Sequence, residues 1–170
     1  WTLSRGLGDV YKRQIMNRGP FNIRVYGILI DQDALLVSDE RYSGLEFTKF
    51  PGGGLEVGEG THECLIREFQ EELNTPIEVI DHFYTTHFYQ PSAFDQNQQL
   101  MSIYYRVQSE GALPSQIFRE PLQFEDSKTE KIDQHRWVAL DQLKPEMFKW
   151  SVDKYVCQLI LDQLSVLKMP

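Results

Sequence analysis

Three glutamates lie within one or two turns of a predicted helix near the middle of the chain. Glu68, Glu71 and Glu72 fall on one stripe of a helix predicted from Thr61 to Leu73, and Arg67 lies beside that stripe. Carboxylates this close in a cleft repel by roughly 3 kcal/mol per pair at an effective dielectric of 20, so they need a positive partner. Oxygen ligands on one face suit Mg²⁺ or Mn²⁺ and phosphate chemistry. An isolated acidic helix would more simply be a solvated face.

A run of three glycines, Gly52 to Gly54, favours the metal-site interpretation. Pro51 and these glycines end a strand predicted from Glu46 to Phe50, and the segment Gly52–Gly60 is predicted to be a loop. Glycines let backbone carbonyls and amides approach an ion or a phosphate closely. The run alone is typical of a plain turn, and it lacks the Lys-Ser/Thr ending of a nucleotide-binding P-loop.

Local signals mark the C-terminal end of the predicted helix and its buried side. Asn74 tolerates the left-handed conformation that often follows a helix, and Pro76 biases the preceding residue toward extended geometry. The apolar stripe predicted to face the core consists of Leu65, Ile66, Phe69 and Leu73. The helix is therefore predicted to carry separate acidic and apolar stripes.

The segment from Gly53 to Thr75 resembles the Nudix box. Gly53 is followed after five residues by Glu59, and after seven more by the run Arg67-Glu68-Phe69-Gln70-Glu71-Glu72. This fixed spacing of one glycine, five charged residues and one apolar position is a specific signal. Two positions depart from the family pattern, since Asn74 replaces a usual glycine and Thr75 a bulky aliphatic residue. Asn74 should keep the left-handed cap, and Thr75 affects local packing alone.

The resemblance extends to most of Asn22 to Leu167, including the segment Arg136-Trp137-Val138. It implies an α/β fold, a Nudix-like α/β/α sandwich with a mixed β-sheet between helices. It also implies a divalent-cation-dependent pyrophosphohydrolase with Mg²⁺ or Mn²⁺ as cofactor. The substrate would be a nucleoside diphosphate linked to another moiety: a nucleotide sugar, an ADP-ribose-like compound or a nucleoside triphosphate.

The resemblance also implies roles for individual residues. The metal ligands would be three carboxylates and one backbone carbonyl: Glu68, Glu71, Glu72 and Gly53. Arg67 would orient the glutamates and belongs with them to the catalytic set, and Glu59 would support it by pairing near Arg67. Bound cations would neutralise the pyrophosphate and lower the pKa of a water, whose proton a carboxylate takes.

Other site residues stay open at this stage. The general base is either a box glutamate or an acid of a later loop, with candidates Glu125, Asp126 and Glu130. No substrate-binding residue is assigned. Phe88, Tyr89 and Phe94 flank a long polar loop and are candidate contacts, although aromatic residues in strands are more often core residues. None of the four histidines receives a role.

Hydrophobic patterning predicts the remaining elements. A hairpin of Ile23–Ile30 and Ala34–Val37 is followed later by strands at Ile77–Tyr89, Leu100–Val107 and Gln134–Ala139, and by an amphipathic helix over Val152–Leu167. Strands interleaved with two separate helices favour a sheet covered by helices on its faces.

Composition limits the partners. Residues 16–170 are predicted to form one domain, and residues 1–15 a non-native or disordered N-terminal segment. The net charge of −8 argues against a nucleic-acid footprint. Local cations such as Arg24, Lys49 and Arg67 leave room for a small-molecule nucleoside diphosphate derivative. No apolar run approaches the roughly 20 residues that cross a bilayer, which predicts no membrane and a cytoplasmic location.

Cys64 and Cys157 lack partners at zinc-ligand spacing and are predicted to be buried free thiols. A homodimer is left open. Two other functions remain as alternatives: a catalytically silent Nudix module that senses a nucleotide derivative, and an mRNA-cap or RNA-end hydrolase. Every charged box position is present, which opposes the first, and the second would need a basic channel that the net charge does not indicate.

Overall fold

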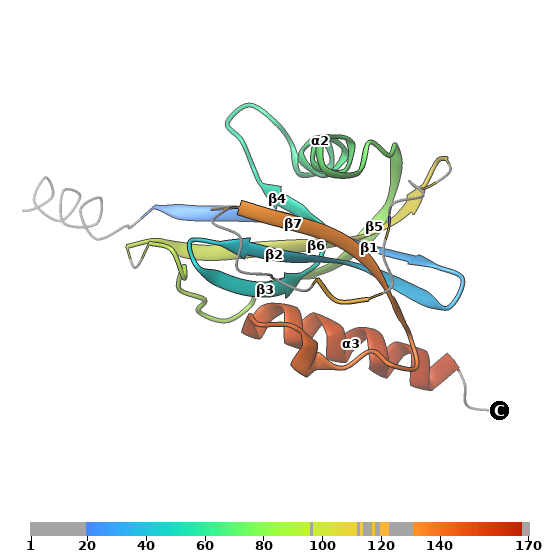
Figure 1. Ribbon diagram of the computed structural model, residues 1–170. Helices are drawn as coiled ribbons and strands as arrows, with labels where there is room; N and C mark the ends of the chain where they lie inside the picture. Colours follow the sequence, from blue (N-terminus) through green and yellow to red (C-terminus); the bar gives the residue numbers. More distant parts are fainter. Residues whose placement is uncertain are drawn as a thin grey trace, which may run out of the picture.

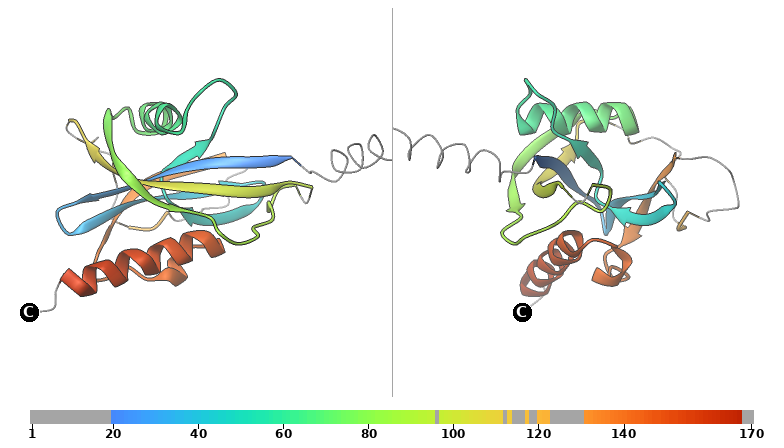
Figure 2. Two further views of the ribbon diagram at one scale, coloured as in Figure 1. Left: turned by 180° about the vertical axis from the view of Figure 1, so that it is seen from behind. Right: turned by 90° about the vertical axis from the view of Figure 1, so that its left-hand side faces the viewer.

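The computed structural model describes residues 20–95, 97–111, 113, 117, 120–122 and 131–167. Its elements in chain order are β1 (Phe21–Asp31), β2 (Ala34–Tyr42), β3 (Leu45–Lys49), β4 (Gly52–Gly54), α2 (Thr61–Leu73), β5 (Ile77–Thr85), β6 (Gln99–Ser109), β7 (Lys131–Ala139), the 3-10 helix η1 (Pro145–Met147) and α3 (Ser151–Leu167). Helices α2 and α3 cover opposite faces of the strands (Figures 1 and 2). The predicted α/β architecture, a mixed sheet between helices, is confirmed.

The sheet is mixed because its central pair is parallel. Its main path runs β3-β2-β1-β6-β5, with β4 beside β1 and β7 beside β2. Strands β1 and β6 run parallel from the pair Phe21 and Gln99 to the pair Leu29 and Val107, whereas the other strand pairs are antiparallel. Strand β2 pairs with β1 only near the hairpin turn. Beyond it, β4 takes the place beside β1, which brings the glycine segment into the sheet.

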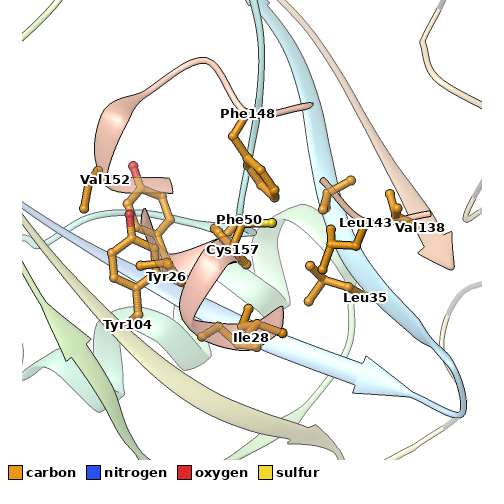
Figure 3. Close-up of a cluster of buried hydrophobic side chains, with 13 residues drawn as sticks. Tyr26, Ile28, Leu35, Phe50, Tyr104, Val138, Leu143, Phe148, Val152 and Cys157 are labelled. Carbon is orange, nitrogen blue, oxygen red and sulfur yellow. The ribbon is translucent and has the colours of Figure 1, made fainter. Parts of the chain in front are cut away.

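Alternating side chains of β1 divide the core into two clusters. Val25 and Leu29 pack with Phe69 on the α2 side, while Tyr26 and Ile28 belong to the cluster under α3. Figure 3 shows the α3-side cluster, in which Tyr26 and Tyr104 lie together with ring centroids 5.2 Å apart. Apolar packing thus supports both faces of the sheet, which gives the site a rigid support.

The prediction that Gly52–Gly60 is entirely a loop is wrong at its start. Gly52–Gly54 forms β4, which pairs antiparallel with Arg24 to Tyr26 of β1. A side chain would not fit at the first of these positions: a Cβ on Gly52 would lie 2.3 Å from the Val25 carbonyl oxygen, and Gly52 also has a φ of 127°. Glycines weaken a strand in isolation, but at Gly52 the neighbouring strand comes too close for any other residue.

The apolar stripe predicted for α2 is partly wrong. Ile66, expected in the core, is 44% exposed, while Cys64 is buried instead. The side chains of Glu68 and Glu72 are only 13% and 18% exposed, which is the partly buried setting of the metal-site interpretation and not the solvated face of the simpler alternative. Gly53 leaves room for the Glu68 carboxylate.

Other predictions agree closely with the structure. Helix α2 has the predicted bounds, and Asn74 ends it in the left-handed conformation with φ 49° and ψ 39°. Strand β5 ends at Thr85, short of the predicted Tyr89. Both cysteines are buried free thiols, as expected. The predicted division into residues 1–15 and one domain at 16–170 stays a prediction, and residues 1–15 lie outside the described part.

Candidate active site

The guanidinium of Arg67 is the centre of a hydrogen-bonded cluster between α2 and β4. It donates to both carboxylate oxygens of Glu59, with Nη2–Oε1 at 2.8 Å and Nε–Oε2 at 3.1 Å. Its Nη1 donates to Glu68 at 3.0 Å and to Glu71 at 3.3 Å, and its Nη2 to the carbonyl oxygen of Gly54 at 3.1 Å. A planar fork with several donors can bind this many acceptors at fixed angles, which the single ammonium of a lysine cannot.

The hydrogen bonds in this cluster keep both Arg67 and Glu59 ionised. The hydrogen bonds from Arg67 lower the pKa of Glu59 to about 2, and the bond to Glu59 is also the main reason that the pKa of Arg67 is raised. Burial raises the pKa of the Cys64 thiol to about 12, so this neighbour stays protonated and uncharged. Arg67 and Glu59 thus form a charged pair that positions the other carboxylates.

Glu68 lies against the bare backbone of Gly53. A Cβ placed on Gly53 would fall 2.3 Å from the Glu68 carboxyl carbon, so only glycine leaves space for this side chain. Burial raises the pKa of Glu68, and the neighbouring charge of Glu72 raises it further, against the opposing effect of Arg67. A buried carboxylate next to a second negative charge forms a place where added positive charge is stabilising.

Glu72 connects the helix with a second set of charged residues. Its Oε1 lies 4.0 Å from Nζ of Lys49, and its Oε2 lies 3.4 Å from Nε2 of His135, a buried residue. Lys49 is itself buried, pairs with Glu40 at 2.9 Å and donates to the Gly52 carbonyl at 2.6 Å. Burial opposes the charge on Lys49, but Glu72 and Glu40 outweigh that effect and raise its pKa.

Glu71 differs from its two neighbours in exposure. Its side chain is 61% exposed and meets Arg67 at the edge of the cluster. Among the described residues, no three Asp, Glu, His or Cys side chains are arranged so that they could hold a metal ion as they stand. The oxygen donors Glu68, Glu71 and Glu72 nevertheless face the same glycine-lined side of α2 or its rim, an arrangement that suits a hydrated hard cation.

A family model described as the NUDIX domain matches residues 20–159, which is most of the chain. The chain belongs to the Nudix family. As a Nudix enzyme it is a hydrolase that acts on phosphoric anhydride bonds. No curated protein sequence gave a significant match.

Solved structures show the same Nudix fold at low sequence identity. A Nudix hydrolase from Nitrosomonas europaea has 16% identity and a TM-score of 0.61, with 89% of this chain and 98% of that chain covered. A MutT protein from Methanosarcina mazei has 15% identity and a TM-score of 0.59, with 87% and 97% covered. A UDP-X diphosphatase has 14% identity and a TM-score of 0.54, with 91% and 71% covered. These likenesses concern the fold alone.

The Nudix box residues are brought together as a group. Glu59, Arg67, Glu68 and Glu71 share direct hydrogen bonds, and Gly53 contacts Glu68. Of the candidate substrate contacts, Phe94 lines a cavity, Tyr89 is 69% exposed, and Phe88 packs against the core under α3. The loop candidates for the general base, Glu125, Asp126 and Glu130, lie outside the described residues.

Sequence reasoning missed two partners of the Nudix helix. His135 received no role, yet it lies beside Glu72 in the buried interior. Lys49 was noted only as a local cation, whereas it bridges Glu40, Glu72 and the Gly52 carbonyl. The available signal for Lys49 was its place two residues before Pro51 and the glycine run, whereas His135 lies in a distant strand and carried no signal.

Proposed function

We propose that this Nudix protein is a divalent-cation-dependent pyrophosphohydrolase that cleaves a nucleoside diphosphate linked to another moiety. The observation that carries the proposal is the Arg67 cluster, which holds Glu59, Glu68 and Glu71 against the glycine strand β4. An acidic helix with a purely structural role would not need an arginine that donates to five oxygen atoms, nor glycines on the neighbouring strand.

The residues present fit Mg²⁺ or Mn²⁺. All donors are hard oxygens, burial and the neighbouring Glu72 disfavour the charge on Glu68, and a side chain at Gly53 would fill the space beside Glu68. Glu68, Glu71, Glu72 and the Gly53 carbonyl would hold the ion. When bound, it would neutralise pyrophosphate charge and lower the pKa of a coordinated water.

The chain's own residues would then perform distinct tasks. Arg67 orients Glu68 and Glu71, and Glu59 keeps that guanidinium in place as an ionised partner. Lys49 holds the Gly52 carbonyl and thereby the start of β4. A carboxylate accepts the proton of the attacking water, and the exposed Glu71 is the box residue most accessible to it.

The setting of the reaction is also a proposal. Among the described residues, no helix combines the length and the hydropathy that a membrane span requires. The Nudix family acts on small nucleotide derivatives, and we take a small molecule of this kind as the partner. A cytoplasmic location and a homodimer stay predictions.

A substrate panel tests the proposal. Purified protein would be mixed with nucleotide sugars, ADP-ribose and nucleoside triphosphates, with Mg²⁺, with Mn²⁺ and with a chelator, and released phosphate-bearing products would be quantified. Turnover of at least one nucleoside diphosphate compound with either cation, abolished by the chelator, is expected. Tight binding of such a compound without any turnover would instead favour the silent sensing module.

A further inference from the structure

The three Nudix glutamates are oriented from two different directions. Arg67, on the same helix, donates to Glu68 at 3.0 Å and to Glu71 at 3.3 Å. Glu72 faces two side chains from the sheet: its Oε1 lies 4.0 Å from Nζ of Lys49, and its Oε2 lies 3.4 Å from Nε2 of His135. The orientation of Glu72 therefore involves residues outside α2.

The pairing of three strands places Lys49 and His135 on either side of Glu72. In the antiparallel pairs β3-β2 and β2-β7, Ser38 is the partner of both Lys49 and His135. Directly paired residues point to the same face of a sheet, so Lys49, Ser38 and His135 form one row across the three strands. The ends of the row are two strand spacings apart, roughly 9.5 Å, which leaves room for a carboxylate between them.

His135 is a buried histidine with one ring nitrogen close to Glu72. Its side chain is 8% exposed, and its Nε2 is buried and makes no hydrogen bond with any described residue. A buried N–H that lacks a hydrogen bond is destabilising, so such groups are usually paired. The 3.4 Å from Nε2 to Oε2 of Glu72 is slightly longer than the roughly 2.7–3.2 Å of an N–H···O hydrogen bond. A small rotation of either side chain would form that bond.

Lys49 supplies charge to Glu72 and not a directed bond. Its Nζ lies 2.9 Å from Glu40 and donates to the Gly52 carbonyl at 2.6 Å. Its side chain also lines the cavity of about 400 Å³ on the α3 side of the sheet, which Phe94 lines as well. The 4.0 Å from Nζ to Glu72 is beyond hydrogen-bond distance. Of the two residues, His135 is thus the closer donor, and its planar ring can fix the direction of the carboxylate.

We propose that His135 is a positioning residue of the cation site: its Nε2–H donates to Oε2 of Glu72 and fixes the orientation in which this carboxylate meets a divalent cation. The inference rests on the proposed function, because Glu72 is one of the proposed cation ligands. His135 would thus orient Glu72 as Arg67 orients Glu68 and Glu71. Removal of a residue that orients a metal ligand typically weakens metal binding by about 10- to 100-fold.

Calorimetric titration of the full chain with Mn²⁺ tests the inference without any turnover. His135→Leu removes the donor, and its Mn²⁺ affinity should be at least about 10-fold weaker than that of the parent. His135→Gln carries an amide N–H that can take the place of Nε2–H, so its affinity should stay within about 3-fold of the parent. His62→Leu removes an exposed histidine from α2 and should bind Mn²⁺ as the parent does. Equal losses in the two His135 variants would overturn the inference.

A variant of Glu72 shows whether His135 acts through this carboxylate. Glu72→Gln should itself weaken Mn²⁺ binding by at least about 10-fold. The addition of His135→Leu to Glu72→Gln should weaken it by less than about 3-fold more, because the carboxylate that His135 orients is already gone. A His135→Leu effect of the same size with and without Glu72 would overturn the inference. Melting curves recorded in a chelator would confirm that each variant is folded.

Nitrogen NMR of the histidine rings tests the hydrogen bond without any cation. The ring signals of His135 would be assigned by their loss in His135→Gln. A proton on Nε2 is expected, because this nitrogen faces a carboxylate oxygen. A ring that carries its proton on Nδ1 alone would overturn the inference, and this result does not require His135→Leu to fold.

Failure of this inference can be distinguished from failure of the proposed function. Saturable Mn²⁺ binding that is equally strong in the parent and in His135→Leu would contradict the role of His135 and leave the proposed function standing. The absence of saturable Mn²⁺ binding in the parent would contradict both.

Discussion

Two carboxyl groups on opposite sides of the sheet, Glu59 and Asp153, have opposite electrostatic environments. On the α2 side, two hydrogen bonds from Arg67 lower the pKa of Glu59 to about 2. On the α3 side, burial raises the pKa of Asp153 to about 7, although Tyr104 donates a hydrogen bond to it. The charge of Glu59 is therefore fixed by internal pairing, whereas the charge of Asp153 depends on what lies beside it.

The largest effect expected on the α2 side comes from Glu71→Gln. Loss of this carboxylate should lower cation-dependent turnover by at least about 100-fold, since it removes charge where the reaction needs it. The melting temperature should stay nearly unchanged, because the side chain is 61% exposed. Glu63→Gln is the matched control: it is exposed on the same helix and can still accept the Gly60 N–H bond. Equal turnover in the two variants would contradict the assignment.

Replacement of Arg67 should have the next largest effect. Arg67→Ala and Arg67→Lys are both expected to lower turnover by about 10- to 100-fold, because neither side chain can bind Glu59 and Glu68 with a planar fork. Arg106 pairs with Asp81 in an exposed position and serves as control. Steady-state kinetics should show parental turnover for Arg106→Ala. A parental rate in Arg67→Lys would show that charge alone is sufficient.

Adjacent glycines allow a finer test. Gly53→Ala should lower turnover by about 10-fold, because its Cβ would displace the Glu68 carboxylate while the flexible side chain lets the fold survive. Gly54→Ala should be close to parental, since the nearest atom to a Cβ there is 3.9 Å away. Rates and melting curves of both variants would be measured together. Equal losses of rate would remove the steric argument for Gly53.

The α3 side predicts a pH effect on stability. The pKa of Asp153 is about 7 in the folded protein, above the ordinary aspartate value of 3.8, so the folded state binds this proton more tightly. Its contribution is thus complete below about pH 4 and is lost as pH rises through 7. Between about pH 5 and pH 8 the melting temperature should therefore fall more in the parent than in Asp153→Asn. Identical falls would contradict the raised pKa.

Glu59 and Asp153 affect stability in different pH ranges. Glu59 has a lowered pKa, so its contribution to stability is present above the ordinary glutamate pKa of 4.5 and is lost as pH falls toward 2. It does not change between pH 5 and 8. The difference between parent and Asp153→Asn in that range therefore reports on the α3 side alone.

Sequence reasoning was most accurate where local signals decide the structure. The bounds of α2 follow from residues next to each other in the chain, such as Asn74 and Pro76, and they were predicted correctly. These bounds depend on short-range geometry that a sequence encodes directly. The pairing of Glu59 with Arg67 was implied by the resemblance to the Nudix box, and the two side chains share hydrogen bonds.

Features that depend on distant neighbours were missed. Strand β4 pairs with β1 at a distance that leaves no room for a side chain at Gly52, and the space that Glu68 occupies is left by Gly53. The cavity combines Lys49, Phe94 and Asp153 from segments far apart in the chain. A helical wheel shows which face of α3 is apolar. It does not show which polar residue near the start of α3 lines the cavity on that side of the sheet.

Direct measurement of cation binding tests the central claim most closely. Mn²⁺ would be titrated into parent, Glu71→Gln and Glu63→Gln protein, and free ion would be followed by electron paramagnetic resonance. The account predicts saturable binding in the parent and in Glu63→Gln, and affinity at least about 10-fold weaker in Glu71→Gln. Equal Mn²⁺ affinity in all three proteins, or no saturable binding in the parent, would contradict the assignment of the Nudix helix as the cation site.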